Sequence, residues 1–200
     1  MRQEFAKEWK RKLFHILLGA ALIFLFWQDS IGAQTLAAIL LVGVIVSGAF
    51  MVRRFKVIAW FLELFDRIEI IPGRGALTFI AGLALAAALF PKNIALAAMA
   101  IVTFADAAAA IAGTIWGRRA NPLNRSKTIE GSVAFLLFAF ISSWLFVPAV
   151  GAYSAAITGT LVEAALPSAS QRSIWLRLVL DDNLLIPLIV GLSLLIVTSI

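Results

Sequence analysis

The sequence predicts an all-α bundle of about seven transmembrane helices, with the N-terminus in the cytoplasm. Apolar residues make up 62% of the 200 residues and charged residues only 14%, whereas about 25% of an ordinary soluble domain is charged. So few charges cannot cover a water-facing surface, which excludes a soluble domain and a disordered chain. The chain has no cysteine, so disulfides and thiolate sites are excluded as well.

The predicted spans follow one another along a single integral-membrane domain, residues 1–200. The first apolar stretch follows Arg11 and Lys12 and has no small-residue cleavage pattern after Trp27, so we expect a span rather than a cleaved signal. Each later stretch begins or ends at a charged connection or a Pro/Gly break and approaches the length needed to cross about 30 Å of hydrocarbon. The seven stretches are 13–27, 31–52, 75–90, 93–117, 129–150, 152–166 and 183–200.

The placement of Lys and Arg predicts the orientation. These residues gather in the N-terminal tail, in the connection 53–74, in the loop 118–127 and before the last span, and of the 17 only Lys92 falls on the other face. Short cationic loops stay in the cytoplasm, so the N-terminus is expected inside. Segment 55–68 mixes charge with large apolar groups and is expected to lie flat in the interface. The positive net charge thus serves topology, and we expect no nucleic-acid partner.

Asp106 is the residue that a bilayer tolerates least, because it lies eleven residues before the end of a span at Gly117. Ionisable groups inside spans cost roughly 2.5–3.5 kcal/mol and predict a functional site. The alternative is an aspartate bonded to a hydroxyl of a neighbouring helix. Ala109, Gly113 and Gly117 recur every four residues on one face, where another backbone or a phosphate can approach closely.

The loop after this span carries the chemistry of a phosphate site. Cations and free N–H groups at a helix N-terminus bind polyphosphates. Glu130 has three open interpretations: an ion-pair partner, a Mg²⁺ ligand or a capping group. The loop and the first turn of the next helix supply Arg118, Arg119, Arg125, Lys127, Thr128, Gly131 and Ser132.

Two more clusters end on the same predicted face. Arg11, Lys12 and His15 share one side of a helix, where they can reach phosphate oxygens, although a single histidine is often structural. Arg74, between two glycines, is expected to contact a phosphate or to anchor the third span. Oxygen ligands that suit Mg²⁺ come from three further residues, and helix capping is an alternative for the two aspartates among them. They are Glu163, Asp181 and Asp182.

With these residues assembled, the chain resembles the CTP-dependent lipid kinases: dolichol kinase, phytol and farnesol kinases, and the CTP-dependent diacylglycerol kinase. That family's pattern is Asp-x-x-Ala-x-x-x-Gly-x-x-x-Gly, eight residues, then Lys-Lys-Thr-x-Glu-Gly. It matches from Asp106 to Gly117 and again over 126–131, except that Ser126 replaces the first lysine. Arg125, one position earlier, can replace that phosphate contact.

The resemblance implies transfer of the γ-phosphate of CTP, with Mg²⁺, to the hydroxyl of a membrane isoprenoid alcohol such as dolichol or phytol. Asp106, Lys127 and His15 are the expected catalytic residues. The expected metal ligands are Asp106, Glu130, Glu163, Asp181 and Asp182. CTP and its phosphates would meet Arg11, Lys12, Arg74, Ala109, Gly113, Gly117, Arg118, Arg119, Arg125, Lys127, Thr128, Gly131 and Ser132.

Three alternatives stay open. A CTP-dependent diacylglycerol kinase would use the same residues on another acceptor, and a phosphatidate cytidylyltransferase-like enzyme would release pyrophosphate instead of CDP. A small ion-coupled transporter would use Asp106 and Glu163 as ion relays. In each case the site is expected at the cytoplasmic face of a multi-pass membrane protein. The sequence does not indicate an oligomeric state.

Overall fold

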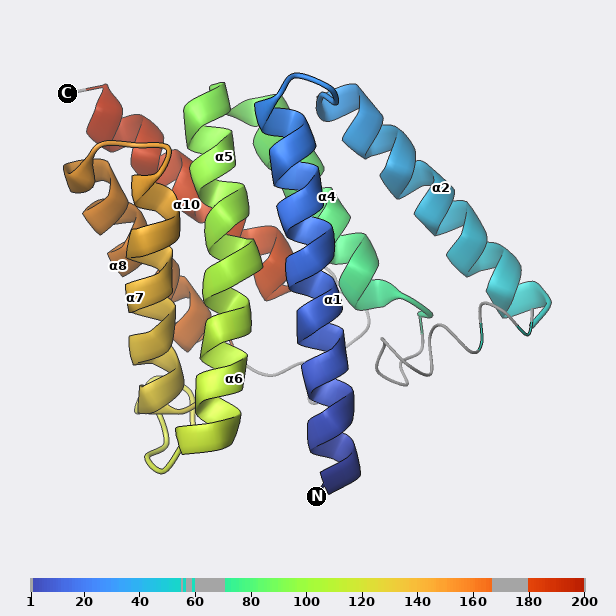
Figure 1. The fold of residues 1–200 in the computed structure, drawn as a ribbon, viewed down its shortest axis with the longest axis horizontal. Helices are drawn as coiled ribbons and strands as arrows, with labels where there is room; N and C mark the ends of the chain where they lie inside the picture. The colour runs from blue at the N-terminus through green and yellow to red at the C-terminus, as the bar shows by residue number, and fades with distance from the viewer. Residues whose placement is uncertain (1, 55, 57–58, 60–70, 167–179, 200) are drawn as a thin grey trace.

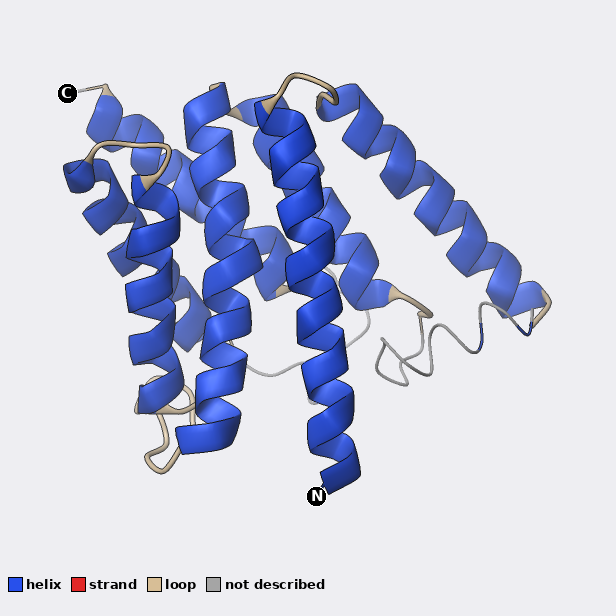
Figure 2. Ribbon diagram, viewed as in Figure 1, coloured by secondary structure: helices blue, strands red, loops and turns tan. Residues whose placement is uncertain are grey.

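In the computed structural model, the described residues are those of the chain other than 1, 55, 57–58, 60–70, 167–179 and 200. They form helices joined by loops, and no strand occurs among them (Figures 1 and 2). The helices are α1 (Arg2–Trp27), α2 (Ala33–Val52), α4 (Arg74–Leu89), α5 (Lys92–Ala100), the π-helix η1 (Ile101–Ala105), α6 (Asp106–Trp116), α7 (Ile129–Trp144), α8 (Ala149–Ala165) and α10 (Asp182–Thr198).

The all-α class is therefore confirmed, and every predicted span has a helical counterpart, with α5, η1 and α6 forming one continuous rod (Figure 1). Two segments, Ala33–Val52 and Lys92–Trp116, are long and apolar enough to cross a membrane by length and composition. The first is mostly exposed and the second lies mostly inside the bundle. Insertion into a bilayer, the number of crossings and their orientation stay predictions.

Two predicted boundaries are wrong. The first helix begins at Arg2 rather than near Leu13, because the cationic tail continues the helix. The break between the fifth and sixth stretches falls before Ala149 rather than after Val150. Pro148 is the N-cap of α8, a place where a proline costs little because the missing N–H needs no partner there. The predicted interfacial segment 55–68 lies almost entirely outside the described residues.

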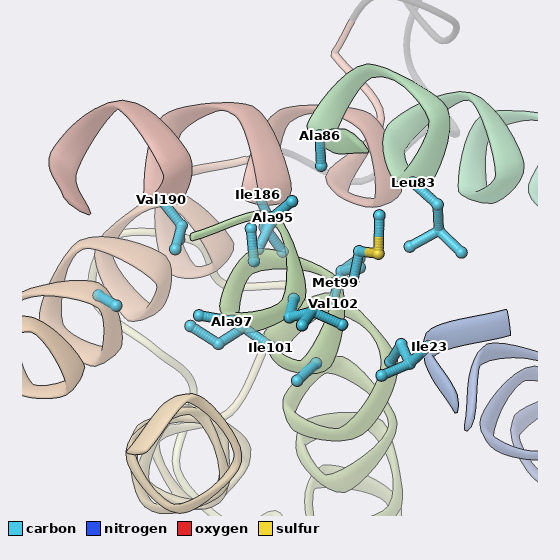
Figure 3. Packing of buried hydrophobic residues seen from close by; sticks show 14 of the residues in the cluster. Ile23, Leu83, Ala86, Ala95, Ala97, Met99, Ile101, Val102, Ile186 and Val190 are labelled. Carbon is cyan, nitrogen blue, oxygen red and sulfur yellow. The ribbon is translucent and has the colours of Figure 1, made fainter. Parts of the chain in front are cut away.

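The core is built around the α5–η1 segment, which packs against α1, α4, α7 and α10. In Figure 3, Met99 of this segment lies between Leu83 of α4 and Ile186 of α10, and Ile101 and Val102 belong to the same cluster. The segment is rich in fully buried alanine, which lets the surrounding helices approach closely. Since this rod carries Asp106 at its centre, the packing fixes the direction in which that carboxylate points.

The ends of the bundle differ in charge. The start of α1 and the loop between α6 and α7 lie at one end, and the turn between α1 and α2 and the start of α5 lie at the other (Figure 1). The first end carries the cations of the tail and of residues 118–127. At the second end Lys92 pairs with Asp29, with Nζ 2.6 Å from Oδ1. The candidate site is accordingly sought toward the first end.

Candidate functional site

The two halves of the sequence motif pack against each other. A Cβ on Gly131 of α7 would lie 2.9 Å from the carbonyl oxygen of Ala109, and a Cβ on Gly113 would lie 3.0 Å from Thr128 Oγ1. The sequence analysis expected either another backbone or a phosphate to approach the small-residue face. In the structure the backbone at the start of α7 approaches it. Thr128 also lies close to Gly117, at 2.7 Å from a Cβ there. Thr128 and Gly131 therefore occupy part of this face, and contact of the nucleotide with Gly113 and Gly117 stays a prediction.

The N–H groups at the start of α7 also have internal acceptors. Thr128 is the N-cap, and its Oγ1 accepts a hydrogen bond from the Gly131 N–H at 3.1 Å. The Ile129 N–H donates to the Arg119 carbonyl at 2.9 Å, and the Ser132 N–H to the Thr128 carbonyl at 3.1 Å. Three of the N–H groups that the sequence offered to a phosphate thus have acceptors within the protein, one of them through capping. Binding through the cationic side chains stays a prediction.

The loop between α6 and α7 has a fixed shape, and two asparagines that the sequence analysis did not single out hold it. Asn121 is buried and its Nδ2 donates to Ser132 Oγ at 2.9 Å. Asn124 Nδ2 donates to the carbonyl of Leu166 at the end of α8 at 2.7 Å. Asn-Pro and Asn close to Ser are typical turn signals and are the pattern that would have found them. Arg118, Arg119 and Arg125 are exposed on this loop.

Lys127 leaves the loop toward α8. Its backbone is held on both sides, since its N–H donates to the Asn124 carbonyl and its carbonyl accepts from the Asn121 N–H, each at 2.9 Å. Its Nζ lies 2.8 Å from Glu163 Oε1 and 2.5 Å from the Glu163 carbonyl. Glu163 is buried, and its Oε2 accepts from Ser132 Oγ at 3.3 Å. Glu163 thus has an ion-pair role in this structure.

Asp106 is buried where η1 passes into α6, and it forms an ion pair with Lys12 of α1. Lys12 is buried as well. His15 and Lys127 lie within electrostatic range of the same carboxylate. The carboxylate is therefore neutralised by a lysine, not by the neighbouring hydroxyl that was the alternative expectation. A residue of α1 thus contacts the start of α6 here; binding of phosphate at this place stays a prediction.

His15 faces the helix that carries Asp106. Its Nε2 lies 3.1 Å from the carbonyl oxygen of Val102, and its ring centroid lies 4.0 Å from that of Phe79. A carbonyl oxygen can only accept, so Nε2 donates and the neutral ring has its lone pair on Nδ1. Arg11, one turn before His15, is partly buried.

Arg74 anchors α4 to α10. Its NH1 lies 2.7 Å from Asp181 Oδ2, and both residues are buried. Asp181 is the N-cap of α10, with Oδ1 accepting from the Asn183 N–H at 3.1 Å. Burial and the neighbouring Asp182 raise the pKa of Asp181 to about 7, against the lowering effect of Arg74. Asp181 therefore caps a helix, which was the alternative to metal binding, and Arg74 anchors α4, which was the alternative to phosphate binding.

The five predicted metal ligands do not share one site. No group of three or more His, Cys, Asp or Glu side chains is placed to hold a metal ion among the residues that the structure describes. The physical reason is that Asp106, Glu163 and Asp181 lie on different helices, each paired with its own cation. Glu130 instead accepts from the Arg119 N–H at 3.4 Å.

Comparison with known proteins gives one informative similarity. The chain is 29% identical over 83 residues to CTP-dependent diacylglycerol kinase 1 of Eremothecium gossypii, which covers 42% of this chain. The matched stretch spans only 26% of that protein. Neither a protein-family model nor a solved structure matches the chain. The similarity supports the CTP-dependent lipid kinase family and no particular member of it.

Proposed function

We propose that this protein is an integral-membrane, CTP-dependent kinase that phosphorylates the hydroxyl of a membrane lipid. The observation that carries the proposal is the buried ion pair of Lys12 and Asp106, with Lys127 within electrostatic range of the same carboxylate although paired with Glu163. A buried carboxylate paired with one lysine, with a second lysine in electrostatic range, is a suitable place for a triphosphate and an alcohol to react. The similarity to a CTP-dependent diacylglycerol kinase supports the same activity.

The lysines would change partners when CTP binds. In the structure Lys12 neutralises Asp106 and Lys127 neutralises Glu163. Phosphate oxygens compete for both ammonium groups, because charge-assisted hydrogen bonds to phosphate are strong. Catalysis of phosphoryl transfer depends mainly on alignment and charge neutralisation, which these cations supply. Arg118, Arg119 and Arg125, exposed on the loop between α6 and α7, would add further positive charge.

Release of Lys12 to the phosphates would leave the Asp106 carboxylate available to the acceptor. In that role it takes the proton of the lipid hydroxyl as the hydroxyl oxygen bonds to the γ-phosphorus. The bond from that phosphorus to the β,γ-bridging oxygen breaks, and CDP leaves. Binding of the metal is the alternative role of Asp106, and the sequence analysis left both open.

Magnesium fits this set of residues only together with the nucleotide. Mg²⁺ at such sites is commonly held by one or two carboxylates and by substrate phosphates, so three clustered carboxylates are not needed. Asp106, the buried carboxylate of the motif, is the residue that would hold it beside the phosphates. Bound Mg²⁺ would supply further neutralisation of the phosphate charge.

Two acceptor classes compete. The sequence analysis put an isoprenoid alcohol first, whereas the similar protein is a diacylglycerol kinase and favours diacylglycerol slightly. Either acceptor requires a bilayer around the protein. The apolar and mostly exposed α2, which is 20 residues and thus about 30 Å long, is consistent with that setting.

The test uses purified protein in liposomes, CTP or ATP labelled at the γ-phosphate, and a panel of polyprenol, phytol and diacylglycerol. We expect label in a lipid phosphate with CTP, equimolar CDP, and loss of the product in Asp106→Asn. A CDP-lipid with pyrophosphate would instead identify a cytidylyltransferase. Ion-coupled uptake without turnover of CTP would identify a transporter.

A further inference from the structure

The helix that carries Asp106 is interrupted directly before that residue. Residues Ile101–Ala105 form a π-helix, in which hydrogen bonds run from i+5 to i instead of from i+4. One additional residue in a turn rotates everything that follows by about 100° relative to a continuous α-helix. The π-helix therefore sets the direction in which Asp106 points, and that direction is toward Lys12 of α1.

A π-helix leaves one carbonyl without a main-chain donor where the regular pattern resumes. For a π-helix over Ile101–Ala105 that returns to α-helix at Asp106, the omitted carbonyl is that of Val102. This is the oxygen to which His15 Nε2 donates at 3.1 Å. The histidine side chain thus replaces the missing N–H at the one place where the distorted helix needs a donor.

Two more features of the contact between α1 and η1 agree with a distorted helix at this place. Three threonines in α-helices donate to the carbonyl four residues earlier: Thr78, Thr114 and Thr160. Thr103 of η1 differs, because it is fully buried and its Oγ1 has no hydrogen-bond partner in the described structure. Opposite it, a Cβ on Gly19 would lie 2.4 Å from Thr103 Cγ2. Only a glycine lets α1 approach η1 this closely, and Gly19 is one helical turn after His15.

We propose that His15 is a positioning residue: it maintains the π-helix through the Val102 carbonyl and so keeps Asp106 directed at Lys12. This rests on the proposed function for its effect on activity. The bond also argues against proton transfer by Nε2, since that nitrogen already carries a hydrogen engaged with a carbonyl. His15 then acts on the reaction through Asp106 and need not contact the substrate.

Two substitutions separate the positioning role from a chemical one. His15→Gln keeps an N–H donor near Val102 but cannot serve as a general base, whereas His15→Phe keeps the ring beside Phe79 and loses the donor. We expect His15→Gln to retain kcat to within about tenfold, and His15→Phe to lose about 10²-fold in kcat with little change in KM for CTP. Gly19→Ala, which moves α1 away from η1, should resemble His15→Phe.

A loss of about 10²–10⁴-fold in both His15 variants, with both still folded, would identify His15 as an acid–base group and overturn the proposal. Unchanged kcat in His15→Phe would overturn it too. A measurement independent of activity is the coupling between Lys12→Met and Asp106→Asn in a double-mutant cycle of melting temperatures. We expect this coupling to persist with His15→Gln and to vanish with His15→Phe. If the unsubstituted protein phosphorylates no lipid, the proposed function fails while this cycle still decides the role of His15.

Discussion

Two buried ion pairs, Lys12–Asp106 and Arg74–Asp181, have the same chemistry but different structural reasons. Asp181 stands at the start of α10, where it caps the helix while Arg74 ties it to α4. Asp106 stands inside a continuous helical rod, where the main chain has no use for a carboxylate. The difference teaches that burial of a charge marks a candidate site only after capping and anchoring have been considered.

The largest difference between the two ion pairs is expected when Asp106 is substituted. In Asp106→Asn we expect kinase activity to fall by about 10²–10⁴-fold. The protein should also lose about 3–5 kcal/mol of stability, because Lys12 is left buried without a counter-charge. The measurements are initial rates with CTP and melting temperature in detergent.

The double variant Lys12→Met/Asp106→Asn is the control for this prediction. It removes both charges, so stability should recover while activity stays lost. Recovery of activity together with stability would mean that the pair is structural, as at Arg74–Asp181.

At the α4–α10 junction the main expected effect of a substitution is on stability. Arg74→Met leaves Asp181 buried without its cation, which should cost about 3–5 kcal/mol at a pH where the carboxylate is charged. A melting temperature that stays near that of the unsubstituted protein at pH 8.5 would contradict an anchoring role.

The pH dependence at this junction follows from the sign of the pKa shift. Asp181 has a folded pKa of about 7, above its ordinary value of 3.8, so the folded state binds more protons and stability falls as pH rises between these values. Removal of Arg74 should raise that pKa further and extend the fall in melting temperature above pH 7. A melting curve series from pH 5 to 9 measures it, and identical pH dependence in Arg74→Met would refute the electrostatic account.

A smaller effect tests how tightly the motif halves pack. Gly131→Ala places a Cβ 2.9 Å from the Ala109 carbonyl, so α6 and α7 must separate, at about 1–3 kcal/mol. Gly48→Ala is the matched control, because no atom lies within 4 Å of that Cβ in α2. The control should gain up to about 1 kcal/mol from helix propensity. Equal melting temperatures in the two variants would contradict the packed stripe.

The smallest effect is expected at the exposed ion pair of the opposite end. Lys92 and Asp29 are 41% and 80% exposed in their side chains, so the pair is well solvated. Lys92→Met should change stability by less than about 0.5 kcal/mol. A loss of stability as large as that of Arg74→Met would show that burial does not explain the difference between the two ion pairs.

Much of the fold could be predicted because hydropathy is a local property of the chain. The seven apolar stretches became helices, and Asp181, for which helix capping was one of two expectations, is the N-cap of α10. The break after Trp144 was placed too late, because Phe146 and Val147 are as apolar as the helices they separate. The continuation of α1 back to Arg2 was missed because the prediction followed apolar residues, and the cationic tail has few of them.

The sequence by itself determined the helical class and the residue types of the candidate site, since both depend on composition and on spacing within one helix. Only the tertiary structure decided which charges meet, because Lys12 and Asp106 are 94 positions apart. It also decided that α7 packs against the small-residue face and that a π-helix precedes Asp106. The physical reason is that helix register and partner choice arise from packing between distant segments, which periodicity within one segment cannot encode.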